Sequence, residues 1–258
     1  MNSSPIGIYD SGFGGLTLWR AVRELLPHES LIYLGDGANC PYGSRRRSEI
    51  EALADRAVGE LLAHGCKIVV VACNTATAAA IDFLRAKYVG VDIVGMEPAV
   101  KPACELTRSG VVGVLATERS LEGDLFHRTA AKYSSNVRVV ARFGRGFVEL
   151  VEGDLEDSAE AERVVRAVVE PMVEEGVDQI VLGCTHYPFL IPVLERVAPG
   201  VNIIDPSMAV ARRVESLLSS RGALAAVHNS AYYRFETFAD EEYRQRLAAK
   251  AQSISRKK

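Results

Sequence analysis

The chain lacks the features that mark membrane and secreted proteins. No segment approaches the roughly 18 uninterrupted apolar residues of a membrane-spanning helix, and the N-terminal residues lack the charged and apolar regions of a signal peptide. Positive charge is not in excess either, because the formal net charge is -3 and gives no basic field for nucleic acid. We therefore expect a cytoplasmic protein that binds neither a membrane nor a nucleic acid.

Motifs for metal and nucleotide binding are also missing. The five cysteines include no CxxC pair, which favours reduced thiols over a disulfide framework and gives zinc only weak support. Cys184 and His186 would need distant partners to bind a metal. Neither GxGxxG nor a Walker pattern occurs, so nucleotide binding is disfavoured.

What the sequence does contain is an alternation of short β-branched runs and longer helical segments. Hydrophobic residues make up 48% of the 258 residues and charged residues 24%, as in a soluble globular protein. The alternation predicts an α/β fold with a mainly parallel sheet. The expected strands are 6–9, 31–35, 67–72, 91–95, 111–116, 137–141, 179–183 and 201–204. Apolar residues at three- and four-residue spacing predict helices at 15–26, 45–65 and 158–176.

A weak internal repeat predicts two similar halves. Three ordered pairs of segments are alike: IGIYDS and VGVLAT, VVVACNTAT and IVLGCTHYP, and IVGMEPAV and NIIDPSMAV. Chance likeness between strand ends is the alternative explanation, but the spacings also agree, since Asp10 precedes Cys73 by 63 residues and Thr117 precedes Cys184 by 67. We expect a first domain of residues 1–98 completed by 207–258, and a second of residues 99–206, facing each other across one cleft.

Two cysteines stand where ligands bind in parallel sheets. Cys73 and Cys184 each follow an apolar run, at the carboxyl end of an expected strand and before a helix. A helix N-terminus stabilises a thiolate, and His186 is a plausible acid/base partner for Cys184. Small polar donors that suit a substrate carboxylate follow the two cysteines: Asn74, Thr75 and Thr185. The other cysteines, Cys40, Cys66 and Cys104, are interpreted as structural.

Two loops add candidate groups. The segment YDSGFGG places Asp10 and Ser11 at the end of the first strand, before glycines that allow close approach to a ligand. A helix N-cap is the alternative role of Asp10. After the second strand, GDGANCPYG offers Tyr42 and Gly43 for a polar group, although a plain turn fits the spacing equally well.

Four of these motifs together resemble a known family. DSGFGG, GDGANCPYG, ACNTATA and GCTHYP, in this order, resemble the glutamate racemases of the aspartate/glutamate racemase superfamily over about residues 6–210. The resemblance implies two pseudo-symmetric α/β domains, each a mainly parallel sheet flanked by helices, with the active site in the interdomain cleft. It also implies a homodimer, no cofactor or metal, glutamate as substrate, and D-glutamate for peptidoglycan as product.

The resemblance further implies roles for individual residues. Cys73 and Cys184 would be the two acid/base thiols, assisted by Asp10 and His186. Glu152 matches a further acid of the family, although a solvated carboxylate at a helix end is its alternative role. The residues that would contact the substrate are Asp10, Ser11, Tyr42, Gly43, Asn74, Thr75, Thr117, Thr185 and His186. The sequence departs from the family pattern at Gly37, at Ser120 and in ARFGRGF at 141–147.

Two thiols suit racemisation because a proton must leave one face of Cα and another must return on the opposite face. A pyridoxal mechanism would need a Schiff-base lysine, and none lies in the strand-end motifs. Three alternatives stay open: a racemase for aspartate or another acidic or cyclic substrate, a hydrolase with Cys184 as nucleophile and His186 as base, and a non-enzymatic amino-acid-binding module.

Overall fold

The chain forms two compact units. The computed structural model describes residues 2–97, 99–122 and 137–256. Unit 1 comprises the chain up to Met96 and from Ser207 onward, and unit 2 is Glu97–Pro206. Residue 98, at which we expected the first domain to end, lies outside the described residues. None of the helices within these ranges has both the length and the apolar character that a bilayer crossing demands.

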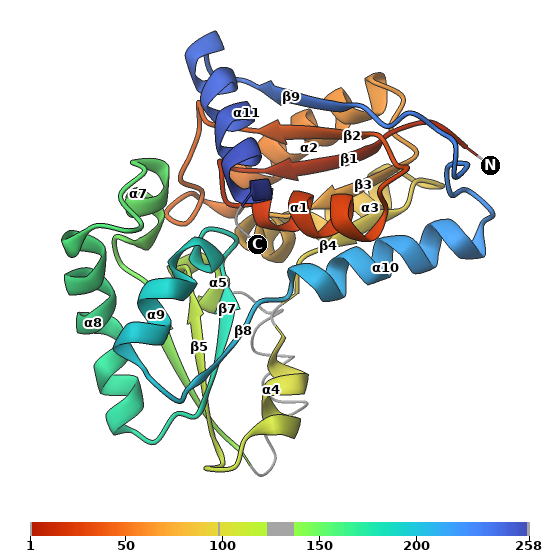
Figure 1. Cartoon of the computed structure of the whole chain (residues 1–258). Helices are drawn as coiled ribbons and strands as arrows, with labels where there is room; N and C mark the ends of the chain where they lie inside the picture. Colours follow the sequence, from red (N-terminus) through yellow and green to blue (C-terminus); the bar gives the residue numbers. More distant parts are fainter. Residues whose placement is uncertain (1, 98, 123–136, 257–258) are drawn as a thin grey trace. The chain divides into compact units, whose positions relative to one another are not determined.

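Unit 1 is built on a five-stranded parallel sheet (Figure 1). Its strands in spatial order are β4 (Ile93–Gly95), β3 (Ile68–Val71), β1 (Ile6–Asp10), β2 (Leu31–Gly35) and β9 (Tyr233–Thr237). Every residue of β1, β2 and β3 is buried, as expected for strands covered on both faces. The prediction of an α/β fold with parallel sheets is therefore confirmed.

The edge strand β9 was not predicted. It pairs in parallel with β2 from Leu31↔Tyr233 to Gly35↔Thr237, so the C-terminal part of the chain completes the sheet begun at the N-terminus. Its residues are only partly buried or exposed, and polar residues alternate with aromatic ones. An edge strand needs no continuous apolar run, which is why the signal was weak.

Helices cover both faces of the unit 1 sheet. They are α1 (Leu16–Leu25), α2 (Arg47–Ala63), α3 (Asn74–Lys87), α10 (Ser207–Ser220) and α11 (Glu241–Arg256). Helices α2 and α3 pack together on one face, and α1 and α10 pack together on the other, with α11 beside α1 (Figure 1). The face under α2 and α3 buries a continuous apolar cluster that includes Tyr9, Tyr42 and Cys73.

Unit 2 repeats this plan with a four-stranded parallel sheet. Its strands in spatial order are β6 (Arg138–Phe143), β5 (Val111–Ala116), β7 (Gln179–Gly183) and β8 (Asn202–Ile204). Its described helices are α4 (Val100–Leu106), α5 (Glu118–Glu122), α7 (Phe147–Glu152), α8 (Ala159–Glu174), the 3-10 helix η1 (Tyr187–Leu190) and α9 (Ile191–Val197). Helices α7, α8 and α9 bury one apolar cluster against the sheet, and α4 belongs to a second.

Candidate active site

Cys73 follows β3 and caps helix α3. It is 4% exposed, has an extended backbone, and its Sγ accepts a hydrogen bond from the backbone N–H of Ala76 at 3.4 Å. The sulfur therefore lies at the positive end of a helix of 14 residues, where negative charge is stabilised. The thiol is also within 3.6 Å of Ser11 Oγ, to which it donates. The structure thus brings Cys73 and Ser11 together.

Asp10 ends the neighbouring strand β1. It lies one residue beyond the register pair Tyr9↔Val71, so it occupies the same edge of the sheet as Cys73. It is fully buried, and its Oδ1 accepts the backbone N–H of Gly12 at 2.9 Å. A glycine is required at position 15, because a Cβ on this residue would lie 2.8 Å from the Cβ of Asp10. The glycines after Asp10 therefore let α1 begin directly against this strand end.

Asn74 lies in the first turn of α3 and is nearly buried. The residue is 4% exposed, and its Nδ2 donates to the Met96 carbonyl at 3.4 Å. Within the described part of the chain, its Oδ1 is buried without a hydrogen-bond partner. A buried acceptor of this kind is costly unless a ligand donor or water satisfies it. The next residue, Thr75, is also buried in the first turn of α3.

The hydroxyl of Tyr42 belongs to a buried hydrogen-bond network. It donates to Asp36 Oδ2 at 2.5 Å and accepts from the hydroxyl of Tyr9 at 2.7 Å. Asn39 Nδ2 donates to both Asp36 oxygens, at 2.9 and 3.1 Å. This buried network fixes the loop that carries Tyr42 and Gly43.

Asp36 is a buried carboxylate that the sequence analysis did not single out. It is fully buried directly after β2, as Asp10 is at the end of β1, and both are followed by small residues. This shared pattern, an aspartate at a strand end before a small residue, is visible in the sequence and could have drawn attention to Asp36. Burial, followed by the negative charge of Cys73, raises the pKa of Tyr9 well above its ordinary value. Burial likewise raises the pKa of Tyr42, with the charges of Tyr9 and Asp36 adding to the effect.

In unit 2, His186 lies between a thiol and a carboxylate. Its Nδ1 is 3.9 Å from Cys184 Sγ, and its Nε2 is 2.6 Å from Glu152 Oε1. His186 is 2% exposed, Cys184 6% and the Glu152 side chain 19%. Glu152 is the last residue of α7, so packing of α7 beside η1 joins residues that are 34 positions apart.

The expectation of a helix N-terminus at Cys184 needs a correction. Cys184 follows β7, but the segment after it is the four-residue 3-10 helix η1, whose N-cap is His186. Pro188 and Pro192 lie in the first turns of η1 and of α9, where a missing N–H donor is tolerated. Among the described residues, Cys184 makes no cap bond like that of Cys73, and its polar partner is His186.

Thr117 and Thr185 are also at strand ends in unit 2. Thr117 follows β5, is 5% exposed and shares a 2.8 Å hydrogen bond with Ser120 Oγ, the residue at which the family pattern has Thr. Thr185 is 3% exposed beside Cys184. The departure at 141–147 has a packing role, because a Cβ on Gly144 would lie 2.6 Å from the Tyr187 hydroxyl.

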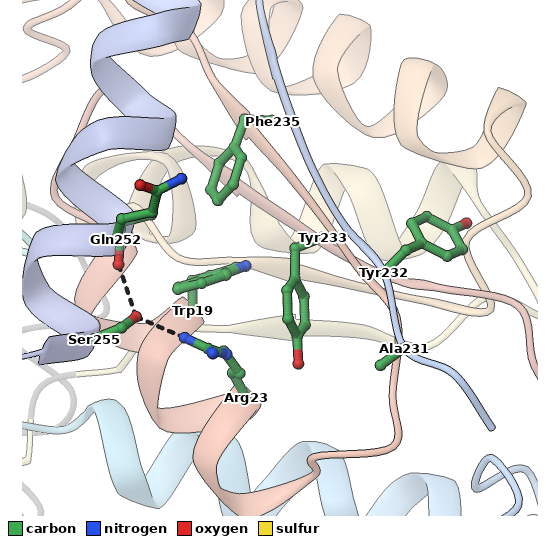
Figure 2. Close-up of a pocket in the computed structure, with 9 residues that line it drawn as sticks. Trp19, Arg23, Ala231, Tyr232, Tyr233, Phe235, Gln252 and Ser255 are labelled. Atoms are coloured by element: carbon green, nitrogen blue, oxygen red, sulfur yellow. Dashed lines mark hydrogen bonds between the residues drawn. The ribbon is translucent and has the colours of Figure 1, made fainter. Parts of the chain in front are cut away.

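A separate pocket of about 300 Å³ lies elsewhere in unit 1. Figure 2 shows its walls, which come from α1, β9 and α11. The Arg23 guanidinium lies over the rings of Trp19 and Tyr233, and Nη1 donates to Ser255 Oγ at 2.7 Å (Figure 2). None of the predicted site residues lines it.

Comparisons with known proteins agree with one another. Residues 17–214 match the family described as Asp/Glu/Hydantoin racemase. A glutamate racemase of Roseiflexus sp. is 47% identical over 228 residues, covering 88% of this chain and 84% of that protein. A glutamate racemase of Pseudomonas paraeruginosa is 44% identical, covering 95% and 92%.

Solved structures give the same picture. The chain is similar to Escherichia coli glutamate racemase in complex with L-glutamate and the activator UDP-MurNAc-Ala, with a TM-score of 0.86, 30% identity and coverage of 97% and 95%. It is also similar to Francisella tularensis glutamate racemase in complex with D-glutamate, with a TM-score of 0.85, 27% identity and coverage of 98% and 95%.

Proposed function

The chain belongs to the Asp/Glu/hydantoin racemase family, with the glutamate racemases, and on this premise we propose that it interconverts L- and D-glutamate with two thiols and no cofactor. The observation that carries the mechanism is that each unit has one buried thiol at a strand end with polar partners of its own. Cys73 has Ser11 and the α3 N-terminus, and Cys184 has His186.

On the Cys184 side, the geometry suits His186 as a base. Because Nε2 faces the Glu152 carboxylate at 2.6 Å, that nitrogen carries the proton and Nδ1 is left with a lone pair toward Cys184 Sγ. His186 can therefore accept the thiol proton and return it. Glu152 would hold the imidazole in this tautomer and stabilise the imidazolium that forms.

On the Cys73 side, a different device favours the thiolate. The Ala76 N–H and the positive end of α3 stabilise charge on the sulfur, whereas Ser11 Oγ accepts a hydrogen bond from the protonated thiol. Asp10, at the end of the adjacent strand, is proposed as the group that assists proton movement at this thiol. Charge stabilisation here needs no imidazole.

The proposed reaction conserves protons. One thiolate removes the Cα proton from one face, the Cα–H electron pair remains on a carbanion-like centre, and the thiol on the other face delivers its proton to Cα. The two sulfurs then hold exchanged protonation states, ready for the reverse direction. Donors to the α-carboxylate would stabilise the transition state, which is the larger part of the energetic task.

We propose that small polar groups around the thiols hold the substrate. Asn74 Oδ1, buried without a protein donor in the described chain, suits the substrate ammonium. Hydroxyls of Ser11, Thr75, Thr117 and Thr185, and the backbone N–H groups of Tyr42 and Gly43, suit its two carboxylates. His186 and Asp10 complete the proposed set of substrate contacts.

The family likeness also suggests the setting of the activity. We propose that the enzyme is a cytoplasmic homodimer whose D-glutamate is used in peptidoglycan. Growth that depends on supplied D-glutamate after gene inactivation would support this use, and unaffected growth without another source of D-glutamate would contradict it. Light scattering of the purified protein tests the dimer.

Chiral chromatography of L-glutamate and L-aspartate, each incubated with the purified protein and no added cofactor, tests the reaction. We expect D-glutamate to accumulate until both enantiomers are equal, and little D-aspartate. Racemisation of aspartate alone would favour the first alternative. Racemisation of neither would overturn the proposal.

A further inference from the structure

Helix α11 packs on both loops that carry the proposed substrate groups of unit 1. It lies beside the carboxyl ends of β1 and β2 (Figure 1). Its inner side includes Tyr243 and the fully buried Leu247. A Cβ on Gly35, the last residue of β2, would lie 3.2 Å from Leu247 Cδ1. The helix is therefore in direct contact with the edge of the sheet at which Asp10 and Cys73 lie.

Tyr243 occupies the space that a side chain at position 37 would need. A Cβ on Gly37 would lie 2.3 Å from Cζ and 2.4 Å from Cε1 of the Tyr243 ring. These distances are far shorter than any stable contact, so Gly37 and the ring fit only as a pair. Gly37 is also one of the positions at which this chain departs from the family pattern, which has Thr or Ser there.

The other contact of Tyr243 is with the loop after Asp10 and Ser11. Its ring stacks on Phe13, with centroids 4.8 Å apart and an interplanar angle of 14°. Phe13 is fully buried, and the cationic groups of Arg246 and Lys250 lie 5.0 and 5.5 Å from its ring centroid. A single helix thus holds Phe13 by stacking and by two cation–π contacts.

We propose that Tyr243 is a positioning residue for the racemase reaction: its ring, packed between Gly37 and Phe13, sets the two loops that present Ser11 and the Tyr42–Gly43 backbone to substrate. This proposal rests on the proposed function. It explains why position 37 is a glycine, since the missing side chain makes room for the Tyr243 ring. It also makes α11, remote in sequence from every proposed catalytic residue, part of the binding machinery.

Three single variants and one double variant test the proposal. Gly37→Thr should expel the ring and raise the KM for glutamate roughly 10-fold while kcat changes less than about 3-fold, because the loops bind substrate and the thiols stay in place. Tyr243→Ala should raise KM in the same way. Tyr243→Phe keeps the ring and should restore wild-type KM.

The double variant Gly37→Thr/Tyr243→Ala separates a shared contact from independent damage. If the residues act through one contact, the double variant should be no worse than the worse single variant, whereas independent effects would multiply to about 100-fold in KM. Gly59→Thr is the matched control, because a Cβ there would be at an ordinary 3.4 Å from the Tyr88 hydroxyl. It should leave KM unchanged.

Fluorescence of Trp19, the only tryptophan, checks that α11 stays docked, because the indole lies beside Arg23, which bonds Ser255 of this helix. A lower kcat at unchanged KM would mean a loss of folded enzyme and would overturn the positioning role. So would multiplicative effects in the double variant. A wild-type protein that racemises no glutamate would instead contradict the proposed function itself.

Discussion

The hydroxyl of Tyr42 donates a 2.5 Å hydrogen bond to Oδ2 of Asp36, and both residues are buried. Within the described chain, no lysine or arginine forms an ion pair with this carboxylate, which is held by uncharged donors from Tyr42 and Asn39. The hydroxyl of Tyr9 adds a third member at 2.7 Å from Tyr42. A fully satisfied buried network of this kind rigidifies the loop that contains it.

This network predicts a specific loss of stability in alkali. Burial raises the pKa of Tyr42 above its ordinary value, so the folded state keeps the phenol protonated while an unfolded tyrosine ionises near pH 10. The stability that the protonated Tyr42 phenol contributes is therefore fully present below about pH 10 and is lost as the pH rises above this value. Tyr42→Phe should make the slope above pH 10 shallower by about 1.4 kcal/mol per pH unit.

The measurement is urea unfolding followed by Trp19 fluorescence, at several pH values. Near pH 7 the same variant should be less stable by about 1–3 kcal/mol, because Asp36 loses a donor. Tyr9→Phe should change the alkaline slope in the same direction, since the pKa of Tyr9 is also raised. An unaltered slope in both variants would show that the two phenols ionise freely in the folded protein.

Each cysteine should have its own exchange reaction. If Cys73 and Cys184 act on opposite faces of Cα, replacing either with Ala should abolish net racemisation. By the family resemblance, Cys73→Ala should retain residual Cα exchange with solvent only for L-glutamate, and Cys184→Ala only for D-glutamate. NMR in heavy water measures this. Near wild-type racemisation by folded Cys73→Ala would instead favour the single-nucleophile hydrolase.

Glu152 should affect the rate of racemisation through its contact with His186. Glu152→Gln removes the carboxylate that fixes the imidazole, so kcat should fall about 10²-fold, within the usual range for acid/base catalysis. The fall should be larger for L-glutamate as substrate if, as the family resemblance implies, Cys184 removes the proton from that enantiomer. Glu149→Gln, an exposed change on the same helix α7, is the control. Equal rates for Glu152→Gln and Glu149→Gln would remove Glu152 from the mechanism.

The buried ion pair between Lys67 and Glu29 should stabilise the packing of the C-terminal segment of unit 1. Lys67 Nζ lies 2.6 Å from Glu29 Oε2, with side chains 4% and 2% exposed, and it also donates to the Ala223 carbonyl. Lys67→Met leaves the Glu29 charge unpaired and should cost about 3–5 kcal/mol of unfolding free energy.

The control for Lys67 is the exposed pair Lys87–Asp55, in which Lys87 is 47% exposed. Lys87→Met should cost only about 0–1 kcal/mol. Urea denaturation compares the two variants. Equal losses would show that burial of the Lys67 pair has no special energetic weight.

Thiol reactivity should differ among the cysteines. Burial raises the pKa of the Cys66 thiol to about 12, so this residue should resist iodoacetamide at pH 8. Alkylation should abolish racemisation only as Cys73 or Cys184 is modified, which peptide mass spectrometry detects. A chelator should leave activity intact, and loss that zinc restores would revive the metal alternative.

The sequence by itself determined the elements and the chemistry available to them. Apolar runs such as 68–71 and 179–183 are buried on both faces, and this local pattern is visible without any tertiary contact. It placed Cys73 and Cys184 at strand ends, because a residue's place after a strand is a property of chain order. The edge strand β9 was not predicted because two of its five residues are exposed and the other three are only partly buried.

Only the tertiary structure decided which side chains meet. Glu152 faces His186 because α7 packs beside η1, and the Tyr42 hydroxyl turns inward because it donates to the buried carboxylate of Asp36. Gly37 lacks a side chain where the ring of Tyr243, about 200 residues later, fills the space. Such contacts depend on how helices settle on a sheet, and the periodicity of a sequence specifies the buried face of an element but not its partner.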